Sequence, residues 1–233
     1  MSRATNVRAS ARRAQIEVIK DVARRLIAEK SVSGLSLREI SREMGVVSSA
    51  LYRYFATRDD LLTALILDAY NDLGQSVERA DAKVAREDAY ARWRASARAI
   101  RRWATNNPHE YALIYGTPIP GYTAPTATID AASRVARVLG AILSESRRVD
   151  TSVALARPAA GGERRFLDVD GLAAIMPGVA SEEYVRALLA WTAIFGFLTF
   201  ELFGQYVGTV KNANMMFDRV VDELAVSLRL RAA

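Results

Sequence analysis

The segment from Ser48 to Phe55, Ser-Ser-Ala-Leu-Tyr-Arg-Tyr-Phe, combines small side chains with hydrogen-bond donors. The small residues would let the backbone approach base edges closely, and Tyr52, Arg53 and Tyr54 could donate hydrogen bonds to bases or phosphates. This combination suits a helix that reads the major groove of double-stranded DNA. The alternative interpretation is an ordinary helical hairpin that carries tyrosines on its surface.

Most of the net positive charge lies in the same part of the chain. Residues 1–60 hold 12 of the 32 Lys and Arg residues but only 7 of the 26 Asp and Glu residues, and the formal net charge is +6. Because neutralised phosphates release counterions, this asymmetry favours a polyanion-binding module at the N-terminus. A solvated basic face would carry the same charge. The arginines before residue 14 either contact DNA or belong to a disordered, solvated tail.

Two short helices must position this segment. Ser36 is the expected N-cap of a helix over Leu37–Met44, with Glu39 completing a capping box, and Gly45 ends that helix. A second helix covers residues 48–55, so the pair fits a helix-turn-helix. The apolar residues available to hold the two helices together are Leu37, Ile40, Met44, Leu51 and Phe55.

Hydrophobic residues make up 51% of the chain, enough for a folded core. They recur at helical spacing along almost the whole chain, and this spacing predicts an all-α fold. We expect an N-terminal three-helix helix-turn-helix domain over residues 1–58 and a larger helical domain for ligand binding and dimerisation over residues 59–233. The expected helices outside the helix-turn-helix cover residues 11–29, 58–75, 86–106, 125–148, 181–207 and 211–229, with a short one from Pro108. Residues 116–122 and 156–169 are expected to be loops.

The residue types argue against an enzyme. The chain has no cysteine and a single histidine, His109, and it lacks a Gly-x-Ser-x-Gly elbow, a phosphate-binding glycine loop and a metal-ligand cluster. We therefore predict no catalytic residue, metal or cofactor, and expect His109 at the surface or at a helix cap rather than on a ligand. The apolar run Ala187–Phe200 is short for a membrane span, and no secretory signal begins the chain, so we expect a cytoplasmic protein without a membrane partner.

The run from Gly34 to Phe55, followed by Thr57–Leu62, resembles the DNA-binding domain of the TetR/AcrR regulators. Gly-Val, Leu-Tyr-x-x-Phe and the basic residue before the next helix all fall at the offsets of that family. The resemblance implies a three-helix DNA-binding domain, a dimer built mainly from the last two helices, and usually repression relieved by a ligand. Carried over by position, the residues that face DNA are Arg38, Val47, Ser48, Ser49, Tyr52, Arg53 and Tyr54, with Arg58 touching phosphate.

Residues 108–122 resemble a C-terminal domain of the WHG type, which is named after a Trp-x-x-x-His-Gly run. In this chain Phe195 stands where that histidine is expected, which favours a more apolar cavity. The aromatic side chains of this half either line a pocket for a small, largely apolar effector or form the core. The pocket candidates are Trp93, Trp103, Tyr111, Tyr115, Tyr122, Trp191 and Phe195.

The last two helices are apolar around much of their surface, and either a second copy or the same chain must cover them. The residues expected at the interface of a homodimer are Leu188, Leu198, Leu202, Phe217, Val221, Leu224 and Leu228. A dimer could read a pseudo-palindromic operator in double-stranded DNA. We therefore expect a sequence-specific transcriptional regulator, a repressor released from DNA by a small apolar ligand. The alternatives are a DNA-binding protein without an effector, architectural or partner-regulated, and an enzyme that uses the C-terminal cavity.

Overall fold

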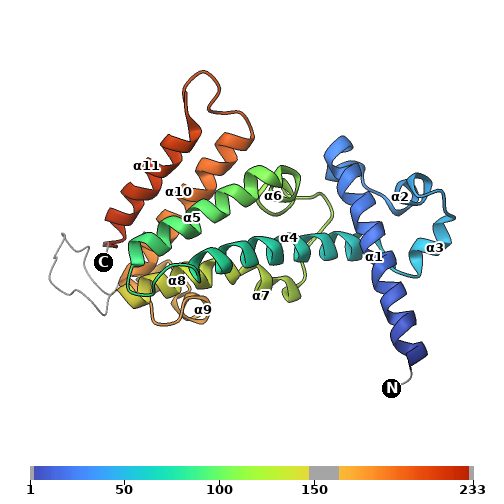
Figure 1. Ribbon diagram of the computed structural model, residues 1–233, viewed down its shortest axis with the longest axis horizontal. Helices are drawn as coiled ribbons and strands as arrows, with labels where there is room; N and C mark the ends of the chain where they lie inside the picture. Colours follow the sequence, from blue (N-terminus) through green and yellow to red (C-terminus); the bar gives the residue numbers. More distant parts are fainter. Residues whose placement is uncertain (1–2, 147–162, 231–233) are drawn as a thin grey trace. The chain divides into compact units, whose positions relative to one another are not determined.

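The computed structural model describes residues 3–146 and 163–230 of the chain (Figure 1). These residues form α-helices and short 3-10 helices, and no β-strand occurs among them, which confirms the all-α fold class. The α-helices are α1 (Arg3–Lys30), α2 (Leu37–Glu43), α3 (Ser48–Tyr52), α4 (Arg58–Asp81), α5 (Ala89–Asn106), α6 (Pro108–Tyr115), α7 (Ile129–Ala132), α8 (Arg134–Ser146), α9 (Val169–Ile175), α10 (Tyr184–Leu202) and α11 (Ala213–Ser227). The 3-10 helices are η1 (Val32–Gly34), η2 (Thr126–Thr128), η3 (Glu163–Arg165) and η4 (Ser181–Glu183).

The chain folds into two compact units. Unit 1 comprises Met1–Ala69 and His109–Ile129, and unit 2 comprises Tyr70–Pro108 and Asp130–Ala233. Helix α4 contributes its first half to unit 1 and its second half to unit 2. These limits follow packing. The division at residue 58 is a functional one, between the DNA-binding helices and the remainder, and it stays a prediction.

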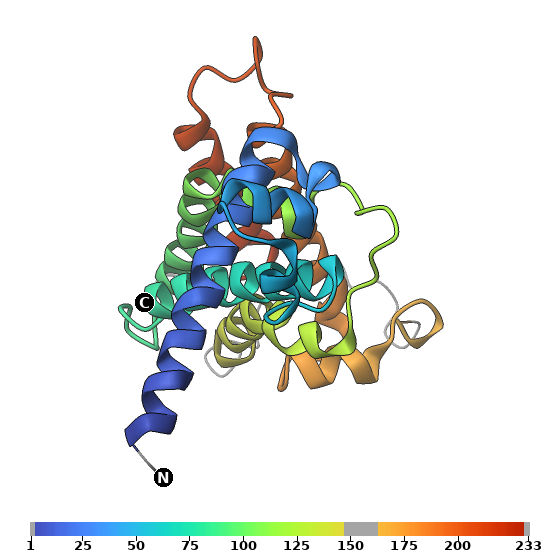
Figure 2. The ribbon, with the colours of Figure 1, turned by 90° about the vertical axis from the view of Figure 1, so that its right-hand side faces the viewer.

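The core of unit 1 gathers the apolar faces of α1 to α4. Helix α1 packs against α2, and α2 packs against α3, as Figure 2 shows from the side of these helices. Burial of apolar side chains at helical spacing stabilises this arrangement by about 1.5–3 kcal/mol for each fully buried aliphatic side chain. The fully buried side chains include Ile19, Ala23, Ile40, Leu51, Leu61 and Leu62.

Helix α1 begins at Arg3, eight residues earlier than the expected start at Ala11. The prediction of a disordered tail before residue 14 is therefore wrong. The side chains of residues 7–14 are exposed, so no apolar periodicity marks this part of the helix in the sequence. Without that signal, only the continuity of helical hydrogen bonds reveals the extension.

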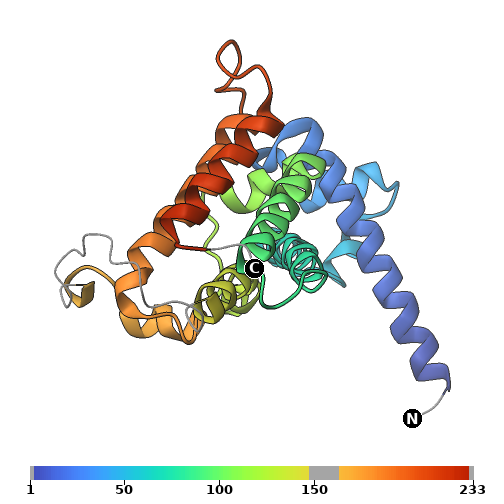
Figure 3. The ribbon, with the colours of Figure 1, turned by 60° about the vertical axis from the view of Figure 1, so that its left-hand side comes forward.

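The core of unit 2 surrounds α5, which packs against α8, α10 and α11. Helices α10 and α11 lie side by side (Figures 1 and 3). The indole N–H of Trp93 on α5 donates to the carbonyl of Val221 on α11 at 2.9 Å, which satisfies a polar group that would otherwise be buried without a partner. The fully buried side chains here also include Ala97, Ile100, Ile194, Leu198 and Phe217.

One buried arginine ties three segments of unit 2 together. The guanidinium of Arg92 is fully buried and donates to both carboxylate oxygens of Asp81 at 2.7 and 3.0 Å, and to Glu145 on α8 at 2.6 Å. A buried cation is tolerated only where such bonds replace its lost hydration. Arg92 therefore holds α5 to α8 and to the end of α4.

Two stretches differ from the helices expected from sequence. Residues 125–146 form η2, α7 and α8 rather than one helix. Within the stretch expected as a loop over 156–169, Glu163–Arg165 form η3 and α9 begins at Val169. Asp168 caps α9 by accepting a hydrogen bond from the N–H of Gly171 at 3.0 Å. Residues 156–162 of that predicted loop lie outside the described residues.

Helix α10 is the most apolar long helix among the described residues. Together with η4 it forms a 22-residue segment, Ser181–Leu202, that is long and apolar enough to cross a membrane by length and composition alone. The uncharged run Ala187–Phe200 covers only part of this segment, which also includes Glu183, Arg186 and Glu201. Ile194 and Leu198 are fully buried in the core of unit 2, so the composition is that of a core helix that also bears exposed apolar residues.

Candidate nucleic-acid interface and apolar cavity

The two short helices of unit 1 form as their local signals require. The hydroxyl of Ser36 accepts a hydrogen bond from the N–H of Glu39 at 3.2 Å, which confirms Ser36 as the N-cap of α2. The carboxylate of Glu39 pairs with Lys30 instead of completing the capping box. Gly45 has a φ of 66°, a left-handed conformation that glycine adopts at little cost, and α2 ends just before it.

A hydroxyl pair joins α2 to α3. The side chain of Ser41 is buried, and its oxygen lies 2.9 Å from the hydroxyl of Ser48, the first residue of α3. With Leu51 buried beneath it, α3 is fixed in orientation at both ends although it is only five residues long. This fixed orientation determines which side chains α3 presents to solvent.

Most residues expected to face DNA lie on one solvent-accessible stretch of α2, α3 and the turns beside them. Arg38, Ser49 and Arg53 are exposed, and the exposed fractions of Val47 and Tyr52 are 72% and 50%. Ser48 and Tyr54 are half-buried. Val47 is too exposed to contribute to the core of unit 1. The nearby side chains of Tyr52 and Arg53 form no hydrogen bond or ion pair with the described residues, so their donors are available to a ligand.

Arg58 occupies a different environment. Its guanidinium donates to the carbonyl oxygens of Leu35 at 2.9 Å and of Val32 at 3.0 Å, in the turn between α1 and α2. Arg58 therefore braces the start of α4 against this turn. Its predicted contact with phosphate stays a prediction.

Arg12 is a candidate that the sequence reasoning did not single out. Its guanidinium donates to the carbonyl of Arg53 at 3.3 Å and lies 5.7 Å from the centre of the Tyr54 ring. A cation over an aromatic face is attracted by the ring, so Arg12 helps to hold the end of α3. No local sequence signal could reveal this contact, because 41 residues separate the partners.

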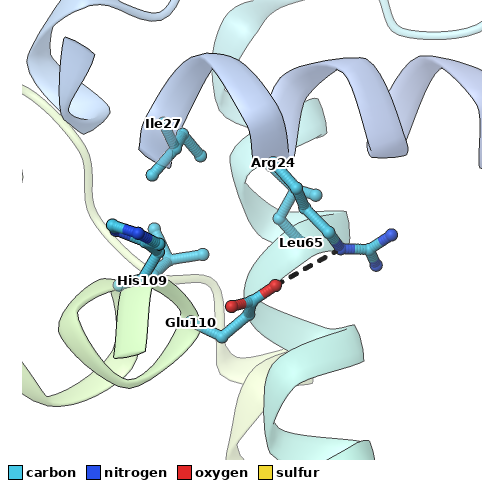
Figure 4. A pocket seen from close by; sticks show the side chains of 6 residues that line it. Arg24, Ile27, Leu65, His109 and Glu110 are labelled. Atoms are coloured by element: carbon cyan, nitrogen blue, oxygen red, sulfur yellow. Dashed lines mark ion pairs between the residues drawn. The ribbon is translucent and has the colours of Figure 1, made fainter. Parts of the chain in front are cut away.

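An ion-pair network attaches α1 to α4 within unit 1. The carboxylate of Asp68 accepts from both Lys20 and Arg24 at 2.7 Å, and Arg24 also lies 3.9 Å from Glu110 on α6 (Figure 4). Burial lowers the pKa of Lys20, but its bonds to Asp68 and Glu17 outweigh that effect, so the net shift is upward. The network keeps α1, α4 and α6 in register.

The pocket drawn in Figure 4 is too small for an organic ligand. Its volume is about 10 Å³, roughly room for one water molecule, beside Arg24, His109 and Glu110. The side chain of His109 is exposed, at the start of α6. The described residues contain no group of three or more His, Cys, Asp and Glu side chains that could hold a metal ion.

Unit 2 encloses a larger cavity with an apolar lining. Its volume is about 160 Å³, comparable to a cavity that holds one benzene ring. Since the N–H of Trp93 already binds Val221, that indole adds no free donor to the cavity. The lining residues are Trp93, Ala136, Leu139, Leu143, Leu172, Ile175, Met176, Ala187, Leu188, Ala190, Trp191 and Leu228.

The seven aromatic pocket candidates separate into groups. Trp93 and Trp191 line the apolar cavity, and Phe195 packs on Trp191 with 4.5 Å between ring centres. Trp103 lies elsewhere in unit 2, where its N–H donates to Asp72 at 2.7 Å. The remaining three belong to unit 1: Tyr111 is buried beside Tyr115, with ring centres 5.3 Å apart, and the hydroxyl of Tyr122 lies 3.0 Å from that of Thr63.

The aliphatic lining of the cavity was not predicted. Met176, Ile175 and Leu172 come from α9 and the residue after it, in a stretch without a helical expectation. Aliphatic residues at helical spacing signal burial, but they do not show whether the buried face meets a neighbour or a void. The cap residue Asp168 was the one signal that could have placed α9.

Burial corrects the predicted dimer residues. Leu198, Phe217, Val221 and Leu228 are buried within the chain, so the interface prediction does not hold for these four positions. Leu188, Leu202 and Leu224 are half-buried. The exposed apolar residues of α10 and its C-cap lie on another face of the helix. We define the α10 stripe as this face, which also includes the exposed Thr192 and the half-buried Gly196; its members are Val185, Leu189, Thr192, Gly196, Phe200 and Phe203.

The arrangement described so far defines a class of protein: an all-helical protein with a helix-turn-helix whose second helix presents uncommitted donors to solvent. Comparisons with known proteins identify the family. Residues 19–65 match the model of bacterial regulatory proteins of the tetR family, and residues 93–224 match that of the tetracyclin repressor-like C-terminal domain. The chain belongs to the TetR family, and it is a DNA-binding transcriptional regulator rather than an enzyme. Its likeness to the WHG subtype stays a resemblance.

Two curated relatives and one solved structure are closely similar. The HTH-type transcriptional regulators Mb1846 of Mycobacterium bovis and Rv1816 of Mycobacterium tuberculosis are each 39% identical over 217 residues, which cover 83% of this chain and 83% of theirs. The crystal structure of the regulatory protein SCO4313 is 32% identical, with a TM-score of 0.77, and the match covers 93% of this chain and 97% of that one.

Proposed function

We propose that the protein is a cytoplasmic, homodimeric repressor that leaves its operator when a small apolar molecule enters the cavity beside Trp93 and Trp191. The observation that carries this proposal is the cavity itself. A cavity of about 160 Å³ leaves packing contacts unmade, and an apolar molecule of matching size would supply them. An occupant bound tightly in this lining is uncharged, because a charge there would lose its hydration without a partner.

Helix α4 can convey occupancy of the cavity to the DNA-binding helices. Its second half belongs to unit 2, whereas its first half is attached to α1 through Asp68 and to the turn after α1 through Arg58. A movement of α4 would therefore displace the helix-turn-helix. A ligand that prefers the displaced conformation shifts the population away from DNA, whereas equal affinity for both conformations changes nothing.

The homodimer is proposed from the α10 stripe. Residues of the stripe follow each other at three- and four-residue spacing on one helix face, and 61% of Leu189 is exposed. A β-carbon at Gly196, in the middle of the stripe, would meet no atom within 4 Å, so a second helix can approach closely there. A second copy would cover this face and pair two recognition helices for a pseudo-palindromic operator.

Ring-sized probes test the ligand response. Genome-wide DNA capture first identifies an operator. The affinity of the protein for this operator is then measured by fluorescence anisotropy with and without benzene or phenol. We expect a probe that raises the melting temperature to weaken operator binding about tenfold or more. Ala136→Phe, which fills the cavity, should abolish the response, and Ala141→Phe on the same helix but outside the lining should preserve it. Unchanged DNA affinity at saturation with a bound probe would exclude induction by that compound.

The dimer is tested by placing a charge on the stripe. Leu189→Glu should convert the protein to monomers in analytical ultracentrifugation, because the interface would bury an unpaired carboxylate. Phe166→Glu, at another exposed apolar position of unit 2, is the matched control and should leave the mass unchanged. A Leu189→Glu protein that remains dimeric would place the interface on another face.

A further inference from the structure

A second hollow of unit 2 lies between α4 and α5 and differs in chemistry from the apolar cavity. It is a groove of about 610 Å³, within the size range of sites for small organic ligands. One wall carries Arg79, near the end of α4, and Lys83, in the turn after it, and the α5 wall carries Arg98 and Arg102. Unlike the apolar cavity, this groove is lined by charged and amide-bearing side chains.

Two positive charges of the groove, those of Arg98 and Arg102, lower the stability of the helix that carries them. Arg98 and Arg102 are four residues apart on α5, whereas Lys83 lies beyond the end of α4 and therefore not on the same helix as Arg79. Like charges at this spacing on a helix destabilise it by about 0.2–0.5 kcal/mol per pair. The negative carboxyl end of α4 attracts Arg79 and Lys83, but it does not neutralise the opposite wall.

Most of these cations have no partner among the described residues. Arg98 pairs with Asp218 at 2.8 and 2.9 Å. In the part of the chain that the structure describes, Arg79, Lys83 and Arg102 form no ion pair. Asp72 is the one acidic residue in the lining, and it accepts the indole N–H of Trp103. The groove therefore presents four cations and one carboxylate.

The remaining lining supplies hydrogen-bonding groups beside the charges. Trp103 is 5% exposed and lies under the groove with its N–H already bonded. The amide nitrogen of Asn107 donates to the carbonyl of Trp103 at 2.9 Å, and the amide oxygen of Asn107 accepts no hydrogen bond from the described residues. Gln75 and Asn106 add further amides. These groups could orient a polar ligand that the cations attract.

We propose that this groove binds a small organic anion that carries at least two phosphate or carboxylate groups. Guanidinium groups match both anions in bidentate geometry, and cations on two walls call for more than one negative group. The proposal adds a second class of ligand to this regulator, and it does not rest on the proposed response to an apolar effector. Pyrophosphate and citrate are suitable probes of the two anion chemistries.

The three tryptophans of the chain allow the two hollows to be observed separately. Trp103 reports on the groove, whereas Trp93 and Trp191 report on the apolar cavity. The full chain is labelled with 5-fluorotryptophan, and its three fluorine resonances are assigned with single Trp→Phe variants. We expect pyrophosphate or citrate in 0.15 M salt to shift the Trp103 resonance alone, with a Kd below about 1 mM.

Charge-matched variants decide whether the groove is the site. In R79A/K83A/R102A the affinity for the active probe should fall about tenfold or more, while R25A/R165A/K211A, which removes the same residue types from other exposed positions, should retain it. Circular dichroism checks that both variants fold, and R79Q/K83Q/R102Q repeats the test with longer side chains. A response to pyrophosphate alone indicates a phosphorylated ligand, and one to citrate alone a polycarboxylate. No shift of Trp103 by either probe, or an equal loss of affinity in both triple variants, would overturn the proposal.

Discussion

The helix-turn-helix and the apolar cavity are built in opposite ways. The residues expected to face DNA lie between Arg38 and Arg58, on short helices whose caps and turns are encoded within a few residues. The cavity is assembled from α5, α8, α9 and α10, with Leu228 at the C-cap of α11. Local signals therefore suffice to recognise the first site, whereas the second exists only after distant segments have packed.

The largest expected effect concerns the framework of unit 2. Arg92→Ala would leave Asp81 and Glu145 without their shared partner, and breaking a buried ion pair in this way costs about 3–5 kcal/mol. Urea denaturation should show this loss. The exposed pair of Arg164 with Asp170 is the control, and Arg164→Ala should leave the urea midpoint unchanged. A small effect of Arg92→Ala would mean that the framework of unit 2 does not depend on its buried charges.

A second prediction concerns the surface of α3. Tyr52→Ala and Arg53→Ala should each weaken operator binding by about 1–3 kcal/mol, because each removes a donor to bases or phosphates. Since both side chains are exposed, the urea midpoint should not change. Arg25→Ala, at an exposed position of α1, serves as the charge control in the anisotropy assay. Full affinity in both α3 variants would mean that another helix enters the groove of the DNA.

A third prediction concerns Arg12, which supports α3 from α1. Arg12→Ala removes a cation–π contact with Tyr54 and a hydrogen bond to the carbonyl of Arg53, so operator affinity should fall by about 0.5–1 kcal/mol. Arg12→Lys keeps the charge but not the planar group. If Lys restores full affinity, Arg12 acts through its charge alone and not by holding α3.

The smallest expected effect is a pH dependence that belongs to unit 2. The hydrogen bonds of Arg134 lower the pKa of Glu78 below its ordinary value of 4.5. The contribution of Glu78 to stability is therefore present above pH 4.5 and is lost as the pH falls below it through the lower folded value. Because 42% of this side chain is exposed, solvent screens the pair and the loss stays below about 1 kcal/mol.

Thermal unfolding between pH 3 and 6 tests this assignment. In Glu78→Gln the decrease of stability below pH 4.5 should be smaller than in the wild-type protein. Glu182→Gln, at an exposed glutamate without an ion pair in the described part of the chain, should keep the wild-type slope. Equal slopes in all three proteins would remove Glu78 from the acid response.

Some features of the fold could be predicted because their causes are local. The N-cap Ser36, the left-handed Gly45 and the proline that begins α6 each act on their own turn of backbone, and the structure confirms these three. Exposure of Tyr52 and Arg53 follows from the same short helix, since burial of Leu51 turns its neighbours outward. The sequence by itself therefore determined the all-helical class and the exposure of Tyr52 and Arg53, two residues predicted to face DNA.

Only the tertiary structure decided which apolar face of α10 is buried in the core and which is exposed to solvent. That helix is apolar on most sides, so periodicity could not separate Leu198, which is buried in the core, from Leu189, which is exposed. In the same way the three tryptophans look alike in sequence, yet two line the apolar cavity and Trp103 lies under the cationic groove. The physical reason is that burial, cavities and unpaired charges depend on residues distant in the chain, which meet only when the helices pack.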